Sequence, residues 1–287
     1  MTGQQQITPD LRQWIEAQLA QGFGREQIVP SMISSGWQAA VAEQAFDLVL
    51  EKTRVGGAIM GLDHPRQANH PLPEPDLSAG TPTLWLGDRR VNVLLSLNHP
   101  RIVLLGGLLS DEECDAMVAA AEVRLARSET VASNPNGSEV NAARTSDGMF
   151  FERGENDVVR RIEARLAQLL NWPVDHGEGL QVLRYRPGAE YLPHYDYFDP
   201  HMAGSAAILS RGGQRVGTVV IYLNTPAAGG ATIFPDVKLE VLPVKGNAVF
   251  FGYERPDPST LTLHGGAPVR EGEKWVATKW LREGVFV

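Results

Sequence analysis

One stretch near the middle of the chain restricts its fold and chemistry more than any other. It is QVLRYRPGAEYLPHYD, residues 181–196. Apolar and polar residues alternate at its start, as is typical of a strand, and the chain turns at Pro187-Gly188 before a second strand begins at Tyr191. The stretch ends in His194-x-Asp196, a spacing that places both side chains on one face of a strand. Such a pair is weak alone, because a structural histidine is the commoner occurrence.

A second stretch, LTLHGGAPVREGEKWVATKWL at residues 261–281, adds the partners that such a pair needs. His264 lies at the end of an expected strand, and Lys274 begins another alternating strand. Two histidines and one carboxylate form the facial triad of non-haem Fe(II) oxygenases, which leaves three coordination positions open. Zn²⁺ also accepts such ligands, but the helical HExxH arrangement of zinc hydrolases is absent, so iron is favoured. A buried lysine needs an anionic partner, which indicates a carboxylate ligand.

Together these residues carry a family resemblance. The pattern Tyr185, Tyr191-x-x-His194-x-Asp196, His264, Lys274 and Trp280 resembles the prolyl 4-hydroxylase family of Fe(II)/2-oxoglutarate dioxygenases. The similarity extends from about residue 101 to about residue 283 and includes GEGLQVLRY, HYDYFD, GGATIFP and KWVATKWLRE. It implies an α+β fold with a double-stranded β-helix (jelly-roll) core, supporting helices and, in this chain, an additional small N-terminal helical segment.

The resemblance also implies roles for individual residues. His194, Asp196 and His264 would bind Fe(II), and Lys274 would bind the distal carboxylate of 2-oxoglutarate with help from the Thr232 hydroxyl. Three aromatic residues would lie beside the co-substrate and the iron: Tyr185, Tyr191 and Trp280. The polar residues expected around the substrate groove are Arg144, Glu178, Arg215 and Arg282. For Arg215 and Arg282, structural ion pairs are an equally good alternative.

The activity implied is hydroxylation of a prolyl residue in a peptide or protein, with decarboxylation of 2-oxoglutarate to succinate and CO₂. The cofactors would be Fe(II), 2-oxoglutarate and O₂, with ascorbate as a reductant. Two alternatives stay open. The same cofactors could serve a free amino acid, another side chain or a small metabolite, or the protein could be a binding protein that senses oxygen or a metabolite.

Composition excludes several other classes of function. The net charge of −8 argues against a nucleic-acid partner. The single cysteine, Cys114, allows no intrachain disulfide, and we expect it to be a small buried residue rather than a nucleophile. The first residues do not form a signal peptide, and no run of about 18 apolar residues occurs. We therefore expect no membrane partner and a cytoplasmic location.

Patterns along the chain predict three regions. Residues 1–53 form three short helices, the first starting at Thr8-Pro9, and are similar to a ubiquitin-associated-type helical module. They could pack on the rest of the chain or dock a partner. Residues 54–83 are rich in Pro and Gly and are predicted to form a linker or an extended segment that wraps the rest of the chain. Residues 84–287 form the jelly-roll domain.

Within this last region, the sequence predicts two helices and a series of short strands. A capping box at residues 110–113 begins a helix over 114–126, and a second amphipathic helix covers 156–171. Residues 128–143 are expected to form a mobile lid, and 197–213, including His201, a second mobile loop. The expected strands cover residues 84–86, 91–97, 102–105, 179–185, 217–223, 231–234, 238–243, 248–251, 261–263 and 274–281. This order suits a jelly roll with helices covering one sheet.

Overall fold

The protein folds into two compact units, residues 1–70 and 71–287. The computed structural model describes residues 7, 11–12, 14–15, 25–35, 37–60, 71–127, 145–200, 202 and 204–287. The expected lid at 128–143 therefore lies outside the described residues, as do Arg144 and His201. Among the helices of the described parts, none is both long and apolar enough to span a bilayer.

The N-terminal unit is helical, as expected. It contains α2 (Arg25–Ser34) and α3 (Ala39–Met60), and the described residues at 11–12 and 14–15 are also helical. Its small core is apolar and consists of Leu11, Ile15, Ile28, Val29, Met32, Ala42, Ala45, Phe46 and Val49. The α3 helix continues past residue 53, where we had expected a linker to begin. Glycines such as Gly56 and Gly57 lower helix stability by about 1 kcal/mol each relative to alanine, but they do not block a helix as proline does.

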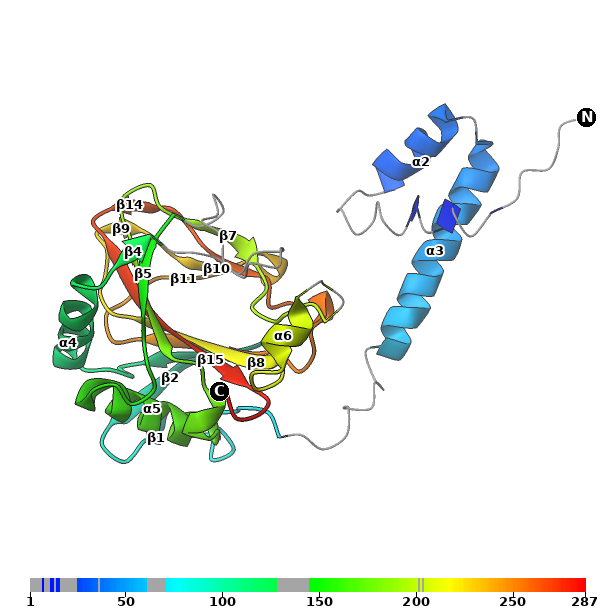
Figure 1. Cartoon of the computed structure of the whole chain (residues 1–287). Helices are drawn as coiled ribbons and strands as arrows, with labels where there is room; N and C mark the ends of the chain where they lie inside the picture. Colours follow the sequence, from blue (N-terminus) through cyan, green and yellow to red (C-terminus); the bar gives the residue numbers. More distant parts are fainter. Residues whose placement is uncertain are drawn as a thin grey trace, which may run out of the picture. The chain divides into compact units, whose positions relative to one another are not determined.

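The C-terminal unit is built on a nine-stranded antiparallel sheet with the order β1-β2-β3-β12-β8-β15-β6-β5-β4 (Figure 1). Its strands are β1 (Thr83–Trp85), β2 (Arg90–Leu97), β3 (Arg101–Gly106), β4 (Ala126–Arg127), β5 (Asp147–Phe151), β6 (Leu180–Tyr185), β8 (Arg215–Tyr222), β12 (Ala248–Gly252) and β15 (Lys274–Arg282). All nine residues of β15 are buried, because this central strand is covered on both faces. Such double coverage explains why β15 carries apolar side chains on both faces.

A smaller sheet lies opposite the central strands of the large one (Figure 1). It has the order β11-β10-β13-β7, with β7 (Tyr191–His194), β10 (Thr232–Phe234), β11 (Leu239–Val241) and β13 (His264–Gly266). Strands β9 (Ala228–Gly229) and β14 (Val269–Glu271) form a separate pair. The two facing sheets form the expected jelly roll, and an apolar core that includes Leu183, Tyr222, Phe234 and Phe251 lies between them.

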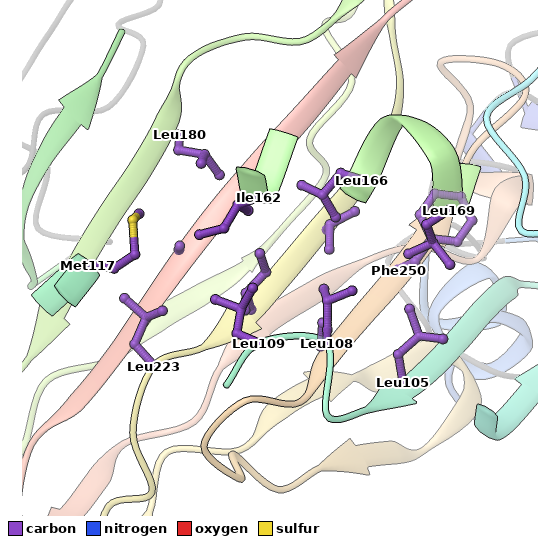
Figure 2. Close-up of a cluster of buried hydrophobic side chains, with 14 of the residues drawn as sticks. Leu105, Leu108, Leu109, Met117, Ile162, Leu166, Leu169, Leu180, Leu223 and Phe250 are labelled. Atoms are coloured by element: carbon purple, nitrogen blue, oxygen red, sulfur yellow. The ribbon is translucent and has the colours of Figure 1, made fainter. Parts of the chain in front are cut away.

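Two helices cover the outer face of the large sheet. They are α4 (Asp111–Glu122), which begins at the capping box of Ser110 and Glu113, and α5 (Asp157–Leu170), which begins at Asn156. The capping box and the start of α5 match the sequence prediction, but α4 begins at Asp111, directly after its cap, rather than at residue 114. Figure 2 shows how the apolar face of α5 meets the sheet: Ile162, Leu166 and Leu169 lie above side chains that include Leu105, Leu108 and Phe250. Cys114 is fully buried in this core, and burial raises the pKa of its thiol to about 11.

Several elements differ from the sequence prediction. Residues 71–83 belong to the C-terminal unit: Pro73 is buried, and Glu74 pairs with Arg101 of β3. A Pro-rich composition is typical of an extended segment that packs on a surface as well as of a free linker, so composition alone did not separate the two. The short helix α6 (Ser205–Leu209) lies in the expected loop, and β4 and β5 were not expected. The remaining short elements are the 3₁₀ turns η1 (Val174–His176), η2 (Pro235–Val237) and η3 (Pro258–Thr260).

Candidate metal and co-substrate site

Pairing of β7 with β13 brings the two predicted histidines together. His264 is directly opposite His194 in this antiparallel pair, and their ring centroids are 4.4 Å apart. Strand β7 ends at His194, so Asp196 lies in the bend that follows. One donor atom from each of His194, Asp196 and His264 lies within 4.8 Å of the others, as a metal site requires.

The strand that carries His264 starts later than expected. The sequence predicted a strand at residues 261–263, but η3 occupies 258–260 and Leu261 adopts a left-handed backbone, φ 54°. These turns delay the start of β13 until His264 itself. Thr262 is the buried residue of this stretch, whereas Leu261 and Leu263 are only partly buried, so the apolar alternation of 261–263 indicated neither the strand nor the buried side chain.

Backbone carbonyl groups fix the tautomer of both histidines. Nδ1 of His194 lies 2.9 Å from the carbonyl oxygen of Leu192, and Nδ1 of His264 lies 2.9 Å from that of Thr262. A carbonyl oxygen only accepts hydrogen bonds, so each Nδ1 carries a proton, and Nε2 is the ring nitrogen that can bind a metal when the ring is neutral. These two Nε2 atoms are 3.5 Å and 3.4 Å from the oxygens of Asp196. Each ring therefore presents a ligand atom to the same point.

Electrostatics favour the protonation states of metal ligands at His194 and Asp196. Burial, and then the neighbouring His264, lower the pKa of His194, which favours the neutral ring. Burial alone raises the pKa of Asp196, but the two imidazoles outweigh it and hold that pKa well below its usual range. The result is a carboxylate that is 7% exposed, without a Lys or Arg side chain paired to it in the described residues.

Two buried hydroxyl groups that we had not predicted lie behind Asp196. Thr218 of β8 donates to Oδ2 of Asp196 at 2.7 Å, and the hydroxyl of Tyr253 lies 2.9 Å from that of Thr218. Arg215 also donates to the backbone carbonyl of Asp196, at 3.3 Å. In the sequence, Thr218 looked like any polar residue of a buried strand. Only its hydrogen bond to Asp196 in the folded protein distinguishes Thr218 from such residues.

Lys274 lies in the same pocket as the triad, which is lined by strands of both sheets. Its side chain is 4% exposed, and Nζ lies 5.5 Å from the ring centroid of Tyr185 and 5.8 Å from that of Tyr222. Burial lowers its pKa to about 8, and no carboxylate in the described part of the chain counteracts this shift. Gly230, with φ 74°, leaves room for the lysine stem, because a Cβ there would be 3.1 Å from Cδ of Lys274.

The predicted hydroxyl donor Thr232 also lines this pocket. It is 4% exposed, and its Oγ1 accepts a hydrogen bond of 2.9 Å from the hydroxyl of Tyr222. Because Tyr222 provides that proton, Thr232 keeps its own to donate to a ligand. The sequence predicted Thr232 and Tyr185 but not Tyr222, which lies on β8 four residues after Thr218.

Tyr191 and Trp280 form aromatic walls beside the triad. The Tyr191 ring stacks on His194 with centroids 3.8 Å apart, and both aromatic residues line the pocket. The guanidinium of Arg215 lies 4.0 Å from the ring centroid of Trp280. The indole N–H of Trp280 is buried and has no acceptor among the described residues. Such a donor costs about 1–3 kcal/mol when it stays unpaired.

The other expected groove residues make internal ion pairs. Glu178 accepts from Arg215 at 2.7 and 2.9 Å and pairs with Arg282 at 3.1 Å. Arg282 is 1% exposed and also donates to the carbonyls of Gly213 and Ile208. These contacts agree with the alternative role for Arg215 and Arg282, in which the two arginines form structural ion pairs and support the walls of the site.

The side chains present fit an Fe(II) centre with a dicarboxylate co-substrate. Two neutral imidazoles and one carboxylate, with no thiolate, suit a metal of intermediate softness and leave coordination positions open. Among the described residues, Asp196 is a buried anion with no Lys or Arg side chain paired to it, and Lys274 is a buried cation with no carboxylate paired to it. Each would gain its missing counter-charge from the metal and the co-substrate, respectively.

Comparison with known proteins agrees with this geometry. Residues 180–282 match the 2OG-Fe(II) oxygenase superfamily. Prolyl 4-hydroxylase 2 of Arabidopsis thaliana is 39% identical over an alignment of 213 residues, which covers 66% of this chain and 69% of that protein. Prolyl 4-hydroxylase 5 of the same plant is 38% identical over an alignment of 221 residues, which covers 70% of this chain and 74% of that protein. A solved viral collagen prolyl hydroxylase from Paramecium Bursaria Chlorella virus-1, in complex with 2OG, is 32% identical; the match covers 63% of this chain and 95% of that one, with a TM-score of 0.49. The identity to the two Arabidopsis relatives, each matched over more than two thirds of its length, shows that the chain belongs to the prolyl 4-hydroxylase family of Fe(II)/2-oxoglutarate dioxygenases.

Proposed function

We propose that this protein hydroxylates a prolyl residue in a peptide or protein. The observation that carries the proposal is one pocket that contains the triad, the unpaired Lys274 and two aromatic walls. Relatives named prolyl 4-hydroxylases support the choice of substrate.

Different residues of the pocket would bind the metal and the co-substrate. The Nε2 atoms of His194 and His264 and the carboxylate of Asp196 would hold Fe(II), while Lys274 and Thr232 would bind the distal carboxylate of 2-oxoglutarate. When bound, Fe(II) and 2-oxoglutarate supply the oxidising chemistry, in which 2-oxoglutarate and O₂ yield succinate, CO₂ and a hydroxylated C–H bond. The protein positions the reactants and excludes water from the pocket.

The aromatic walls suit a flat, apolar ring. Tyr191 and Trp280 line the pocket beside the triad, so a pyrrolidine ring packed between them would lie next to the metal. A carbonyl group of the substrate backbone could accept from the unpaired indole N–H of Trp280. Proline-rich segments enter aromatic-lined grooves at low entropic cost, because their extended conformation is already formed.

The first experiment is an anaerobic titration with Fe(II) and 2-oxoglutarate, followed by O₂ and a proline-rich peptide. We expect a weak visible charge-transfer band, succinate formation, and a peptide product heavier by one oxygen atom. A band with succinate but no peptide product would direct the search to free amino acids or small metabolites. A folded protein that gives no band would contradict the assignment of the cofactors.

Three further expectations are part of the proposal. The buried Cys114 supports a reducing, cytoplasmic location. Ascorbate would serve as the external reductant that an oxidised iron centre requires. The helical N-terminal unit, with its own small core, could dock a partner.

A further inference from the structure

Three strands of the jelly roll bring a short chain of hydroxyl groups to the back of the Asp196 carboxylate. Asp196 follows β7, Thr218 lies within β8, and Tyr253 directly follows β12. Thr218 is fully buried and Tyr253 is 2% exposed. The contacts are 2.7 Å between Oγ1 of Thr218 and Oδ2 of Asp196, and 2.9 Å between the two hydroxyl oxygens.

The direction of both hydrogen bonds follows from the number of protons. An ionised carboxylate only accepts, so Thr218 donates its single proton to Asp196. Thr218 must then accept in its other contact, and Tyr253 must donate. Burial raises the pKa of Tyr253 well above its usual value, so this phenol keeps the proton that it donates. The order is therefore Tyr253 to Thr218 to Asp196.

We propose that Thr218 and Tyr253 are positioning residues that set the orientation of the metal-binding carboxylate. This inference rests on the proposed function, because it concerns the same metal site. Rotation of the Asp196 carboxylate would break its bond to Thr218, so the Asp196 oxygens stay directed at the two histidines. The anchor is rigid: β8 pairs with both β12 and β15 in the middle of the large sheet.

A purely structural role is the competing explanation. In that case the two hydroxyls only satisfy each other's hydrogen bonds inside the core, and their loss would lower stability without changing metal affinity. Removal of hydrogen-bond partners behind metal ligands typically costs 10- to 100-fold in metal affinity or activity. Metal affinity therefore separates the two explanations.

The test is anaerobic titration of the full chain with Co(II), followed by the visible absorption of the bound ion, without 2-oxoglutarate or substrate. Thr218→Val keeps the shape of the side chain and removes the hydroxyl. We expect its dissociation constant for Co(II) to rise about 10- to 100-fold, with a changed spectrum. Thr218→Ser restores the hydroxyl, so it should restore the Co(II) affinity and the absorption spectrum of the wild type. Tyr253→Phe should give a smaller rise.

Tyr222→Phe is the matched control. It removes the phenol of the other buried Tyr–Thr pair, which donates to Thr232 beside Lys274. We expect it to weaken the binding of 2-oxoglutarate and to leave the affinity for Co(II) unchanged.

Each outcome has a defined meaning. Equal Co(II) affinity and spectra in the wild type, Thr218→Val and Tyr253→Phe would overturn the positioning role. If circular dichroism shows that Thr218→Val is unfolded, Tyr253→Phe decides: weaker Co(II) binding supports the proposal, and unchanged binding overturns it. A wild-type protein that binds no Co(II) would overturn the metal site itself, which is a different result from equal binding by all variants.

Discussion

Two buried charges of opposite sign define the site at the scale of single residues. Asp196 faces two imidazoles, and Lys274 faces the rings of two tyrosines. Within the described parts of the chain, Asp196 has no Lys or Arg partner and Lys274 has no carboxylate partner, although buried charges normally require such partners. This contrasts with Glu163 and Lys279, which are equally buried and pair directly. Buried charged side chains without an ion-pair partner in the described residues, Asp196 and Lys274, therefore identify the ligand-binding part of the core.

Loss of a triad residue should remove the metal. We expect His264→Ala and Asp196→Ala each to lose more than the roughly 10- to 100-fold in metal affinity that an outer hydrogen-bond partner is worth. Metal content after anaerobic loading with Fe(II), together with succinate formation, measures the effect. His99→Ala is the control, because it removes an exposed imidazole from a turn. Iron retention by either triad variant at the wild-type level would contradict the assignment.

The affinity for 2-oxoglutarate should depend on pH through Lys274. Its pKa is lowered to about 8 by burial, and a bound carboxylate would raise it again. Below pH 8 the lysine is already charged and affinity is constant. Above pH 8 binding must take up a proton, so the dissociation constant should rise about tenfold per pH unit. Calorimetric titration between pH 7 and 9.5, with Mn(II) in place of iron, measures this dependence.

Lys274→Arg provides the control for this dependence, since a guanidinium stays charged throughout the range. Its affinity should be weaker, because the site is shaped for a lysine, but independent of pH. Lys274→Ala should bind 2-oxoglutarate weakly at every pH while still binding the metal. A wild-type dissociation constant that does not change between pH 7 and 9.5 would show that Lys274 does not carry the anchoring charge.

At the scale of secondary-structure elements, β8 supports both halves of the site. Thr218 and Tyr222 lie on its pocket face and bond to Asp196 and Thr232, respectively. Val219 and Ile221, on the opposite face, pack in the core beneath the helices. The strand alternation therefore places supporting hydroxyls on one side and apolar packing on the other.

The α5 helix is tied to β15 by a buried ion pair, whose loss should destabilise the fold. Nζ of Lys279 lies 2.6 Å from Oε1 of Glu163, and both side chains are at most 3% exposed. Lys279→Met leaves a buried carboxylate without its cation and should cost about 3–5 kcal/mol. The double variant Lys279→Met/Glu163→Gln should recover much of the lost free energy of unfolding. Glutamine is neutral and still accepts from the backbone N–H of Gly154.

The midpoint of urea unfolding gives the loss of stability of the single and of the double variant, provided that the slope of the transition is unchanged. Equal destabilisation of the single and the double variant would show that lost packing, rather than the uncompensated charge, causes the effect.

At the scale of the whole molecule, the chain divides after residue 70, inside the stretch 54–83 that was predicted as a linker. We expect a protein of residues 71–287 to fold and to turn over 2-oxoglutarate, because its cores are formed within that unit. Residues 84–287 alone should be less stable, since they lack buried Pro73 and the Glu74–Arg101 pair.

Thermal melting and succinate formation compare the two truncations. A fragment of residues 71–287 that is insoluble or inactive would indicate that the helical unit is needed for folding. Equal stability of both fragments would show that residues 71–83 contribute no packing.

By itself the sequence predicted the cluster of two histidines and one carboxylate, a buried Lys274, the capping box of α4, the start of α5 and the jelly-roll class. These depend on local spacing, such as His194-x-Asp196, or on capping residues such as Ser110. Only the tertiary structure decided that Thr218 and Tyr253 form a hydrogen-bonded chain to Asp196, that Arg282 is buried against the carbonyls of Gly213 and Ile208, and that β13 begins at His264. Alternation shows which face of a strand a residue occupies, but not which side chain lies across from it. That partner is set by strand pairing between residues far apart in the chain, which local sequence patterns do not encode.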